Sequence, residues 1–119
     1  MTISDNDQQP ALAELARSAL ALWDVPVGAR LRLINLSENA TYLVEAPGGY
    51  RSVLRLHRQG YHSRRSIGCE LAWMTALDSD GGVATPRPLA GRDGALIQSH
   101  GTSTLAPRHL VMFEWLEGA

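Results

Sequence analysis

The sequence predicts an α+β fold: an antiparallel sheet of five or six strands, a crossover helix after the third strand, and an extra N-terminal helix. Three observations lead to this fold class. Short β-rich runs are separated by turn residues, one amphipathic run precedes them, and another follows the third of them. With 119 residues and 45% hydrophobic content, the chain has room for one compact domain or one lobe of a larger protein.

The N-terminal region predicts a tail followed by a helix. Residues 1–9 are polar and lack periodicity, so we expect a flexible tail there. Pro10 suits a first helical turn, and apolar residues at helical spacing continue as far as Trp23. Pro26 and Gly28 then end the helix, which we expect to pack on its own domain.

Three β-rich runs joined by short turns come next, at residues 30–36, 41–46 and 50–57. A strong turn signal, Pro-Gly-Gly at 47–49, separates the second run from the third. Because side chains alternate along a strand, Val53 and Arg55 should share one face of the third strand. Leu54 and Leu56 should share the other face.

The crossover helix is predicted at residues 66–77, where Ile67 and Leu71 belong to an apolar stripe. Glu70 falls on or beside the inward face, where a carboxylate is costly unless it is paired. Arg55 lies in mid-strand among apolar neighbours and also needs an opposite charge. We therefore expect an ion pair between Arg55 and Glu70.

The last third of the chain predicts a hairpin and a final strand. Residues 89–97 have the pattern of a hairpin with Arg-Asp-Gly at its turn, and residues 109–115 have that of a strand. The chain stops directly after this apolar strand, which we interpret as truncation in mid-fold.

Composition and charge disfavour several function classes. A formal net charge of −1 argues against a nucleic-acid partner, and we expect the basic run at residues 58–65 to be a solvated loop. No apolar run approaches the roughly 18 residues of a membrane span, and no signal-peptide pattern opens the chain. Cys69 is the single cysteine and the four histidines lack metal-ligand spacing, so we expect no metal site and a cytoplasmic location.

The sequence contains no lysine, so arginine supplies all 11 of its cationic side chains. Any phosphate or carboxylate contact must therefore use a planar guanidinium, which can hold two oxygens at once.

Five short motifs, in their order and spacing, resemble the aminoglycoside phosphotransferase family, which includes choline-kinase-like and homoserine-kinase-type enzymes. They lie at residues 37–42, 53–56, 70–73, 85–88 and 113–118. The resemblance implies that residues 10–119 form the N-terminal, ATP-binding lobe of a protein-kinase-like fold and end at the hinge. The family's His-Gly-Asp loop does not occur in the sequence, and the catalytic C-terminal lobe is interpreted as absent. The chain alone is thus expected to be inactive, with Mg²⁺ bound only when the second lobe is present.

The same resemblance implies a phosphate-binding role for the ion pair. Arg55 occupies the place of the strand lysine that contacts the α- and β-phosphates of ATP, and Glu70 matches the helix glutamate that holds that cation. Arginine in place of lysine is a departure from the kinase pattern, because its longer fork changes the reach. The alternative is a structural Arg–Glu pair that never meets a nucleotide.

The resemblance also implies contacts from the loop before the second strand. Ser37, Asn39 and Thr41 stand where a kinase folds a glycine-rich loop over the phosphates, and they offer polar donors in place of glycines. The alternative is an ordinary hairpin turn in which Asn39 adopts a left-handed conformation.

An adenine pocket is implied at two further places. Val53 would lie against the adenine ring. The run containing Phe113, Glu114 and Leu116 resembles the hinge, where backbone groups pair with the adenine edge.

Two function hypotheses follow. The first is the ATP-binding lobe of a small-molecule phosphotransferase, whose partners are a nucleotide and the missing lobe. The second is a non-catalytic interaction module that associates with itself through an exposed apolar edge. That edge would consist of Met112, Phe113, Trp115 and Leu116.

Overall fold

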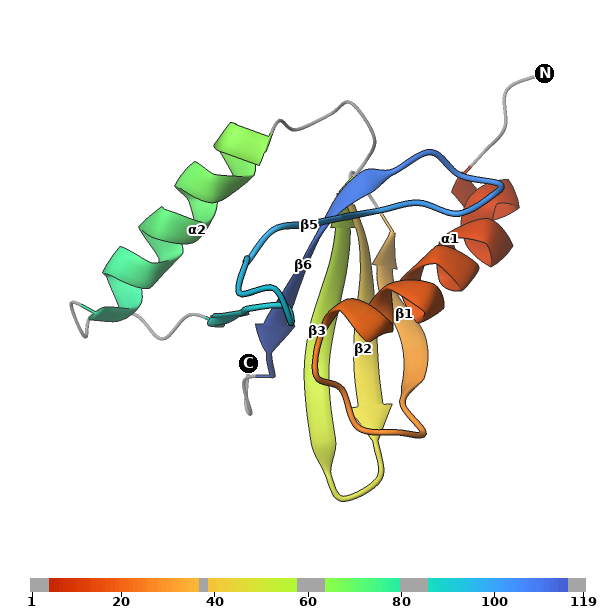
Figure 1. The fold of residues 1–119 in the computed structure, drawn as a ribbon, viewed down its shortest axis with the longest axis horizontal. Helices are drawn as coiled ribbons and strands as arrows, with labels where there is room; N and C mark the ends of the chain where they lie inside the picture. Colours follow the sequence, from red (N-terminus) through yellow and green to blue (C-terminus); the bar gives the residue numbers. More distant parts are fainter. Residues whose placement is uncertain (1–4, 37–38, 58–63, 80–85, 116–119) are drawn as a thin grey trace.

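The structure is a computed structural model that describes residues 5–36, 39–57, 64–79 and 86–115. It is an antiparallel sheet with one helix on each face (Figure 1). Its helices are α1 (Asp5–Ala19), the short 3₁₀ helix η1 (Leu20–Leu22) and α2 (Arg64–Ser79). Its strands are β1 (Arg30–Leu36), β2 (Asn39–Ala46), β3 (Tyr50–His57), β4 (Pro88–Leu89), β5 (Gln98–His100) and β6 (Arg108–Glu114). The predicted α+β fold class, with six strands and a crossover helix after the third, is confirmed.

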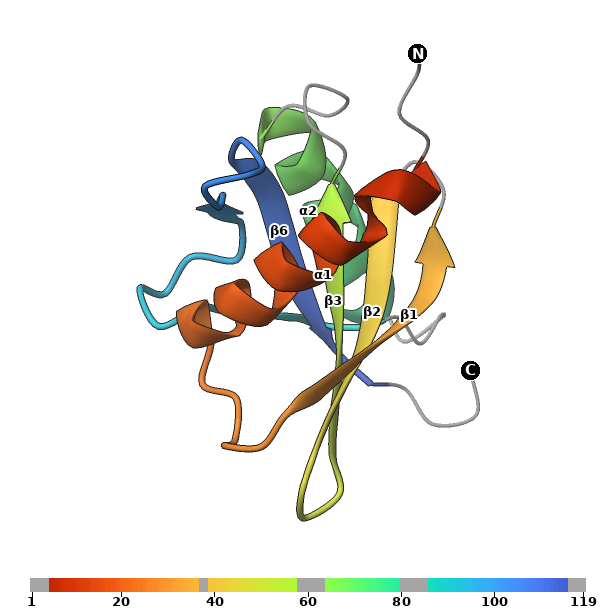
Figure 2. The ribbon, with the colours of Figure 1, turned by 90° about the vertical axis from the view of Figure 1, so that its right-hand side faces the viewer.

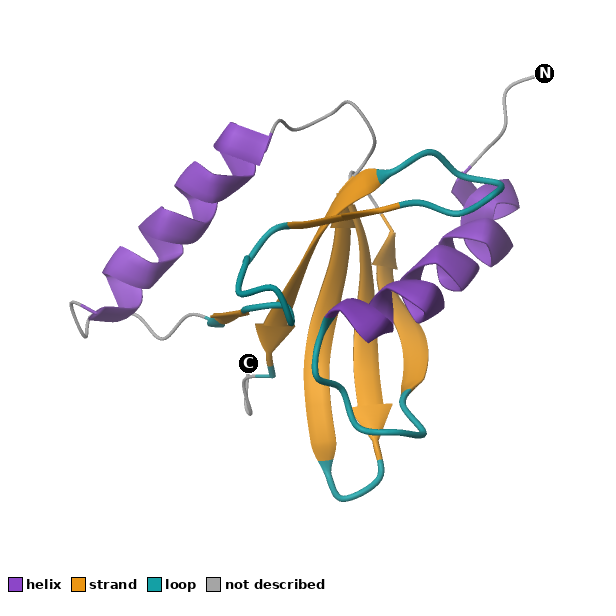
Figure 3. Cartoon of the chain, viewed as in Figure 1, coloured by secondary structure: helices purple, strands orange, loops and turns teal. Residues whose placement is uncertain are grey.

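The strands follow the order β1-β2-β3-β6-β4, and β5 also pairs with β6 (Figure 3). A tight turn joins β2 to β3, and there Gly48 and Gly49 adopt φ angles of +87° and +84°, which favour glycine. Strand β3 is central: Arg55 lies opposite Thr41 of β2 on one side and Val111 of β6 on the other. The sheet therefore holds Arg55 between two paired strands.

Helix α1 begins earlier than the sequence predicted. The helix start predicted at Pro10 is corrected, because the chain is helical from Asp5 onward and Pro10 lies inside the helix. Residues 1–4 lie outside the described part of the chain.

The predicted hairpin at residues 89–97 is wrong. Strands β4 and β5 do not pair with each other, and both instead pair with the outer edge of β6. Leu89 lies opposite Met112, and Gln98 lies opposite Leu110. The two strands therefore form one edge strand that is interrupted by a loop, the β4–β5 loop.

Hydrogen bonds to the short helix η1, which follows α1, explain why the β4–β5 loop leaves the sheet. The backbone N–H of Arg92 donates to the Leu22 carbonyl at 2.7 Å, and Arg92 Nε donates to the Ala21 carbonyl at 3.1 Å. Nearby, Trp23 Nε1 donates to the Leu89 carbonyl at 3.0 Å. The loop is thus held by η1 and cannot turn back on β4.

The apolar core has two parts because helices α1 and α2 lie on opposite faces of the sheet (Figure 2). The larger cluster lies under α1 and consists of Leu12, Leu15, Ala16, Ala19, Trp23, Ala40, Tyr42, Val44, Leu54, Leu56, Leu110 and Met112. The smaller cluster lies under α2 and consists of Ile67, Leu71, Val111 and Phe113. The predicted division of β3 into two faces is therefore confirmed.

The exposed apolar edge expected near the chain end is also corrected. Met112 and Phe113 are buried, and Trp115 is half-buried. The reason is that β4 pairs with this part of β6 while the two helices cover its faces. Leu116 lies outside the described residues. In the parts of the chain that the structure describes, neither helix is long and apolar enough to cross a membrane.

Candidate functional site

The predicted ion pair joins the central strand to the crossover helix. Arg55 Nη1 donates a hydrogen bond to Glu70 Oε1 at 3.2 Å. The Arg55 side chain is 29% exposed and the Glu70 side chain 49%, so Glu70 is not the inward carboxylate that the helical pattern suggested. An ion pair this accessible adds little stability, about 0–1 kcal/mol. Its effect is to orient a cation on the α2 face of the sheet.

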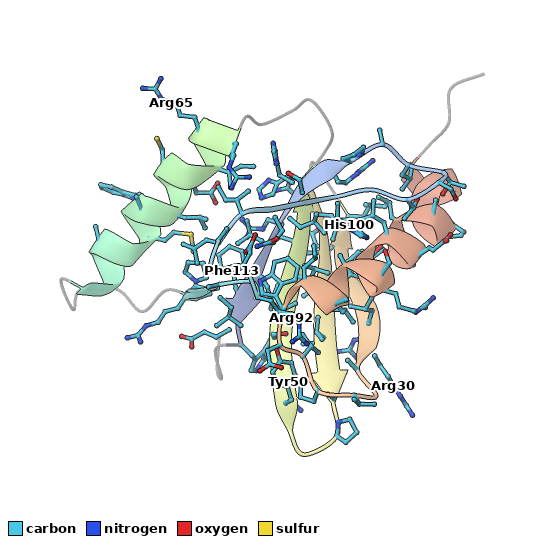
Figure 4. All side chains as sticks on the ribbon, in the orientation of Figure 1. Arg30, Tyr50, Arg65, Arg92, His100 and Phe113 are labelled. Carbon is cyan, nitrogen blue, oxygen red and sulfur yellow. The ribbon has the colours of Figure 1, made fainter. Side chains whose placement is uncertain are left out.

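An aromatic ring contacts the same guanidinium. Arg55 Cζ lies 5.0 Å from the centre of the Phe113 ring, which is within the range of a cation–π interaction. Phe113 is 3% exposed and lies on the side of β6 that faces α2 (Figure 4). It packs in one cluster with Ile67 and Leu71 of that helix. The sequence analysis suggested Phe113 for a backbone contact to adenine and did not foresee the contact between its ring and Arg55.

Two other residues with predicted roles share this face. Thr41 lies opposite Arg55, and Val53 lies opposite Phe113. Paired residues in a sheet project to the same side, so all four residues belong to one surface. The structure thus brings Thr41 and Val53 into the same surface as the Arg55–Glu70 pair.

Asn39 continues this surface at the start of β2, where it lies opposite His57. Its Oδ1 atom is buried and has no hydrogen-bond partner within the described ranges. The left-handed conformation that the alternative gave Asn39 is wrong, because no non-glycine residue in those ranges has a positive φ. The hairpin itself is present, since β1 and β2 pair antiparallel on either side of residues 37–38. Ser37, which was predicted to act with Asn39, lies outside the described residues.

The segment that resembles a hinge, which begins at Phe113, makes more backbone pairings within the sheet than the sequence suggested. Phe113 is paired with both β3 and β4. The backbone N–H of Glu114 donates to the Arg87 carbonyl at 2.9 Å, so this N–H is engaged within the fold. A contact from Glu114 to adenine would therefore have to use its carbonyl. Leu116 lies outside the described residues.

This geometry accompanies a match to a family of known enzymes. The model of the phosphotransferase enzyme family matches residues 30–119, which is most of the chain. The chain belongs to this family. The family resemblance expected from the sequence is confirmed, and so is the fold of a kinase-like N-terminal lobe.

Two solved structures resemble this phosphotransferase lobe. A microcompartment-associated aminopropanol kinase is 47% identical, superposes with a TM-score of 0.78, and matches 87% of this chain and 31% of its own. An amicoumacin kinase in complex with AMP-PNP and Ca²⁺ has a TM-score of 0.70 over 94% of this chain and 32% of its own. The second is 19% identical, so that likeness supports the fold alone.

A curated relative is also similar in sequence to this chain. An uncharacterized protein of Deinococcus radiodurans is 35% identical over 88 residues, which make up 74% of this chain and 25% of that protein. The phosphotransferase lobe thus spans a quarter of this relative and about a third of the two kinases.

A groove lies beside the lobe's crossover helix and was not expected from the sequence. It has a volume of about 600 Å³ and is lined by Arg64, Gly68, Leu71, Ala72, Ala76, Leu96 and Ile97. The exposed ring of Trp73 lies on the same helix. Apolar residues at helical spacing predict a helix with one buried side, but not how closely that side meets the sheet.

Ionisable groups on the α1 face of the lobe are shifted by burial. Burial raises the pKa of Tyr42 above 10.0, and the nearby Arg108 charge opposes this shift. Burial also lowers the pKa of Arg108. Among the residues that the structure describes, no three or more His, Cys, Asp or Glu side chains gather at a point where they could hold a metal ion.

Proposed function

We propose that this chain is the nucleotide-binding lobe of an ATP-dependent phosphotransferase that acts on a hydroxyl group of a small molecule. The observation that carries the proposal is the 3.2 Å bond between Arg55 and Glu70, which holds a cation on the central strand of a phosphotransferase lobe. Asn39 supports it, because it lies on the same face of the sheet and its side-chain amide has an NH₂ group that can donate to a phosphate oxygen.

Arg55 would bind the phosphates of the nucleotide. A guanidinium has five N–H donors in a rigid fork, so it can bond a carboxylate and still donate to phosphate oxygens. Glu70 would keep the fork in place when no nucleotide is bound, which reduces the ordering cost of binding. Bound ATP would supply the phosphoryl group, and the positive charge of Arg55 would stabilise the negative charge of its phosphates.

Val53 and Thr41 would shape the nucleotide site around this cation. Val53 offers an apolar strand surface to the base, and the Thr41 hydroxyl, opposite Arg55, offers a donor to a phosphate oxygen. Ligands for Mg²⁺ and the group that orients the acceptor hydroxyl would come from the second lobe. The isolated lobe would therefore bind nucleotide without transferring phosphate.

For the acceptor, we propose a small amino alcohol. The support is the 47% identity to a kinase named for aminopropanol over 87% of this chain. The acceptor assignment rests on this relationship.

Calorimetric titration with Mg-ATP tests the nucleotide role. We expect Arg55→Ala to bind at least tenfold more weakly than the wild type, because a charge-assisted hydrogen bond contributes about 1.5–3 kcal/mol. Arg17→Ala removes the same charge from an exposed position on α1, and should bind like the wild type. Equal affinity of the wild type and Arg55→Ala would remove Arg55 from the role proposed here.

A chimera tests the division of catalysis between the two lobes. The 119-residue chain would replace the matching lobe of the aminopropanol kinase, and ADP release would be measured with and without aminopropanol. We expect turnover by the chimera that depends on aminopropanol, and none by the 119-residue chain alone. Turnover by the chain alone would contradict the assignment of catalysis to a second lobe.

A further inference from the structure

The Arg55 side chain is fixed from two directions. At one edge of its guanidinium, Nη1 bonds Glu70 at 3.2 Å. Its Cζ lies over the Phe113 ring, 5.0 Å from the ring centre. The partner directly opposite Arg55 in β6 is Val111, and Phe113 stands two residues further along, on the same face. The aromatic contact is thus a diagonal pair between neighbouring strands.

The ion pair by itself is a weak restraint. Both of its side chains are partly exposed, and exposed ion pairs are screened by salt and lose side-chain entropy. An arginine side chain has many rotamers, so one accessible hydrogen bond leaves much of its freedom. An aromatic face restricts a planar guanidinium further, because attraction is greatest over the ring.

Phe113 also contacts the element that carries the carboxylate. Its buried ring packs with Ile67 and Leu71 on the inner side of α2, the helix on which Glu70 lies. One ring therefore touches the cation and also supports the helix that holds the anion. A displacement of this ring would alter both halves of the ion pair.

We propose that Phe113 is a positioning residue that presents the Arg55 guanidinium to the phosphates of the nucleotide. The inference rests on the proposed function and assigns to the ring a role separate from any backbone contact to adenine. It also explains how arginine serves at a strand position where kinases carry lysine. A planar fork over an aromatic face is held in one orientation, whereas an ammonium group has no plane to orient.

Mg-ATP affinity in matched variants tests this role. We expect Phe113→Leu, which keeps an apolar side chain but removes the aromatic face, to weaken binding about fivefold. Phe113→Tyr restores the face and should bind within about twofold of the wild type by the same argument. Ile67→Val removes one methyl group from the same cluster without touching the face, and should leave the affinity unchanged. If Phe113→Leu does not fold, Phe113→Met takes its place as the apolar variant.

A second readout needs no nucleotide. The Arg55 Nε–H resonance in an NMR spectrum should carry an upfield ring-current shift in the wild type and in Phe113→Tyr. The shift should disappear in Phe113→Leu and persist in Ile67→Val.

Two results would overturn the inference while leaving the proposed function intact. The first is that Phe113→Leu binds Mg-ATP as tightly as the wild type. The second is that Phe113→Leu and Ile67→Val weaken Mg-ATP binding equally, which would mean that Phe113 only packs in the apolar cluster. A wild-type chain that fails to bind Mg-ATP would instead refute the proposed function, and with it the role of the ring.

Discussion

The two faces of the sheet differ in what they bury. Under α1, a continuous apolar cluster includes Leu15, Trp23 and Met112, all nearly inaccessible to solvent. Under α2, the buried cluster is small, and beside it lie an accessible ion pair and an open groove. The comparison teaches that stability is concentrated on one face of this lobe, which leaves the other face free to hold a charged site.

Strand β3 serves both faces because its side chains alternate. Leu54 and Leu56 belong to the cluster under α1. Val53 packs on the cluster under α2, and Arg55 projects to that side. A cation can therefore sit at the centre of the sheet without interrupting the larger core.

The largest expected effect comes from the two helical leucines that face the sheet. Leu15→Ala should lower the free energy of unfolding by about 3 kcal/mol, because the site is closed on all sides. Leu71→Ala should cost about 2 kcal/mol, because Leu71 already lines the groove and its neighbours can relax into the space. Urea unfolding measures both values. Equal losses would contradict the division of the core into a closed and an open face.

A pair of glycines tests the attachment of the β4–β5 loop to the α1 side. A Cβ at Gly91 would collide with the Gln98 amide and lie 2.9 Å from the Leu22 carbonyl oxygen. Gly91→Ala should therefore lower the free energy of unfolding by about 2 kcal/mol. Gly68→Ala, in α2, meets only Ile97 at 3.9 Å and should stabilise the protein by about 0.5–1 kcal/mol. Thermal unfolding that showed destabilisation by both variants would contradict this contrast.

The same loop should give the α1 side a pH dependence. The backbone N–H of Ala95 and the side-chain amide of Gln98 donate hydrogen bonds to the Asp93 carboxylate. These hydrogen bonds, the one from Ala95 first, lower the pKa of Asp93 below 3.8. These hydrogen bonds increase the free energy of unfolding above pH 3.8, and this stabilisation is lost as the pH falls through the lowered pKa of Asp93. Asp93→Asn should therefore have a lower free energy of unfolding than the wild type at pH 7, and this difference should disappear in strong acid. A difference that is constant between pH 7 and pH 2 would rule out this linkage.

The smallest effect on stability is expected from the ion pair on the α2 side. Glu70→Ala should change the free energy of unfolding by less than about 0.5 kcal/mol, because the pair is accessible to water. Its Mg-ATP affinity should nevertheless fall, since Arg55 would lose one of its two restraints. Chemical unfolding and calorimetry on the same sample measure both quantities. A large loss of stability with unchanged affinity would reverse the roles of the two faces.

The parts of the fold with local sequence signals could be predicted. Alternation gave the first three strands, helical spacing gave α2, and the charges of Arg55 and Glu70 indicated their pairing. The hairpin prediction failed because turn chemistry at Arg-Asp-Gly marks a local turn but does not tell whether the flanking strands pair with each other or with a third strand. That choice is made by β6 and by η1, which are distant in the sequence.

The ring of Phe113 shows the same limit at the candidate site. Alternation along β6 puts residues 111 and 113 on one face, and this was available from the sequence. The register that places Arg55 opposite Val111, and so within reach of the ring, depends on long-range pairing. The predicted roles of Ser37 and Leu116 stay predictions, as does the contact of Val53 with adenine.

The interrupted edge strand has a consequence for association between chains. Leu89 occupies the position opposite Met112 and Gln98 the position opposite Leu110, which leaves Val111 as the gap between them. The edge strand itself offers an incoming extended peptide only the two residues of β4 and the three residues of β5, so this border of the sheet is a poor template for amyloid-like growth. The opposite border, β1, exposes Arg30 and Arg32, whose like charges repel a second copy aligned beside them.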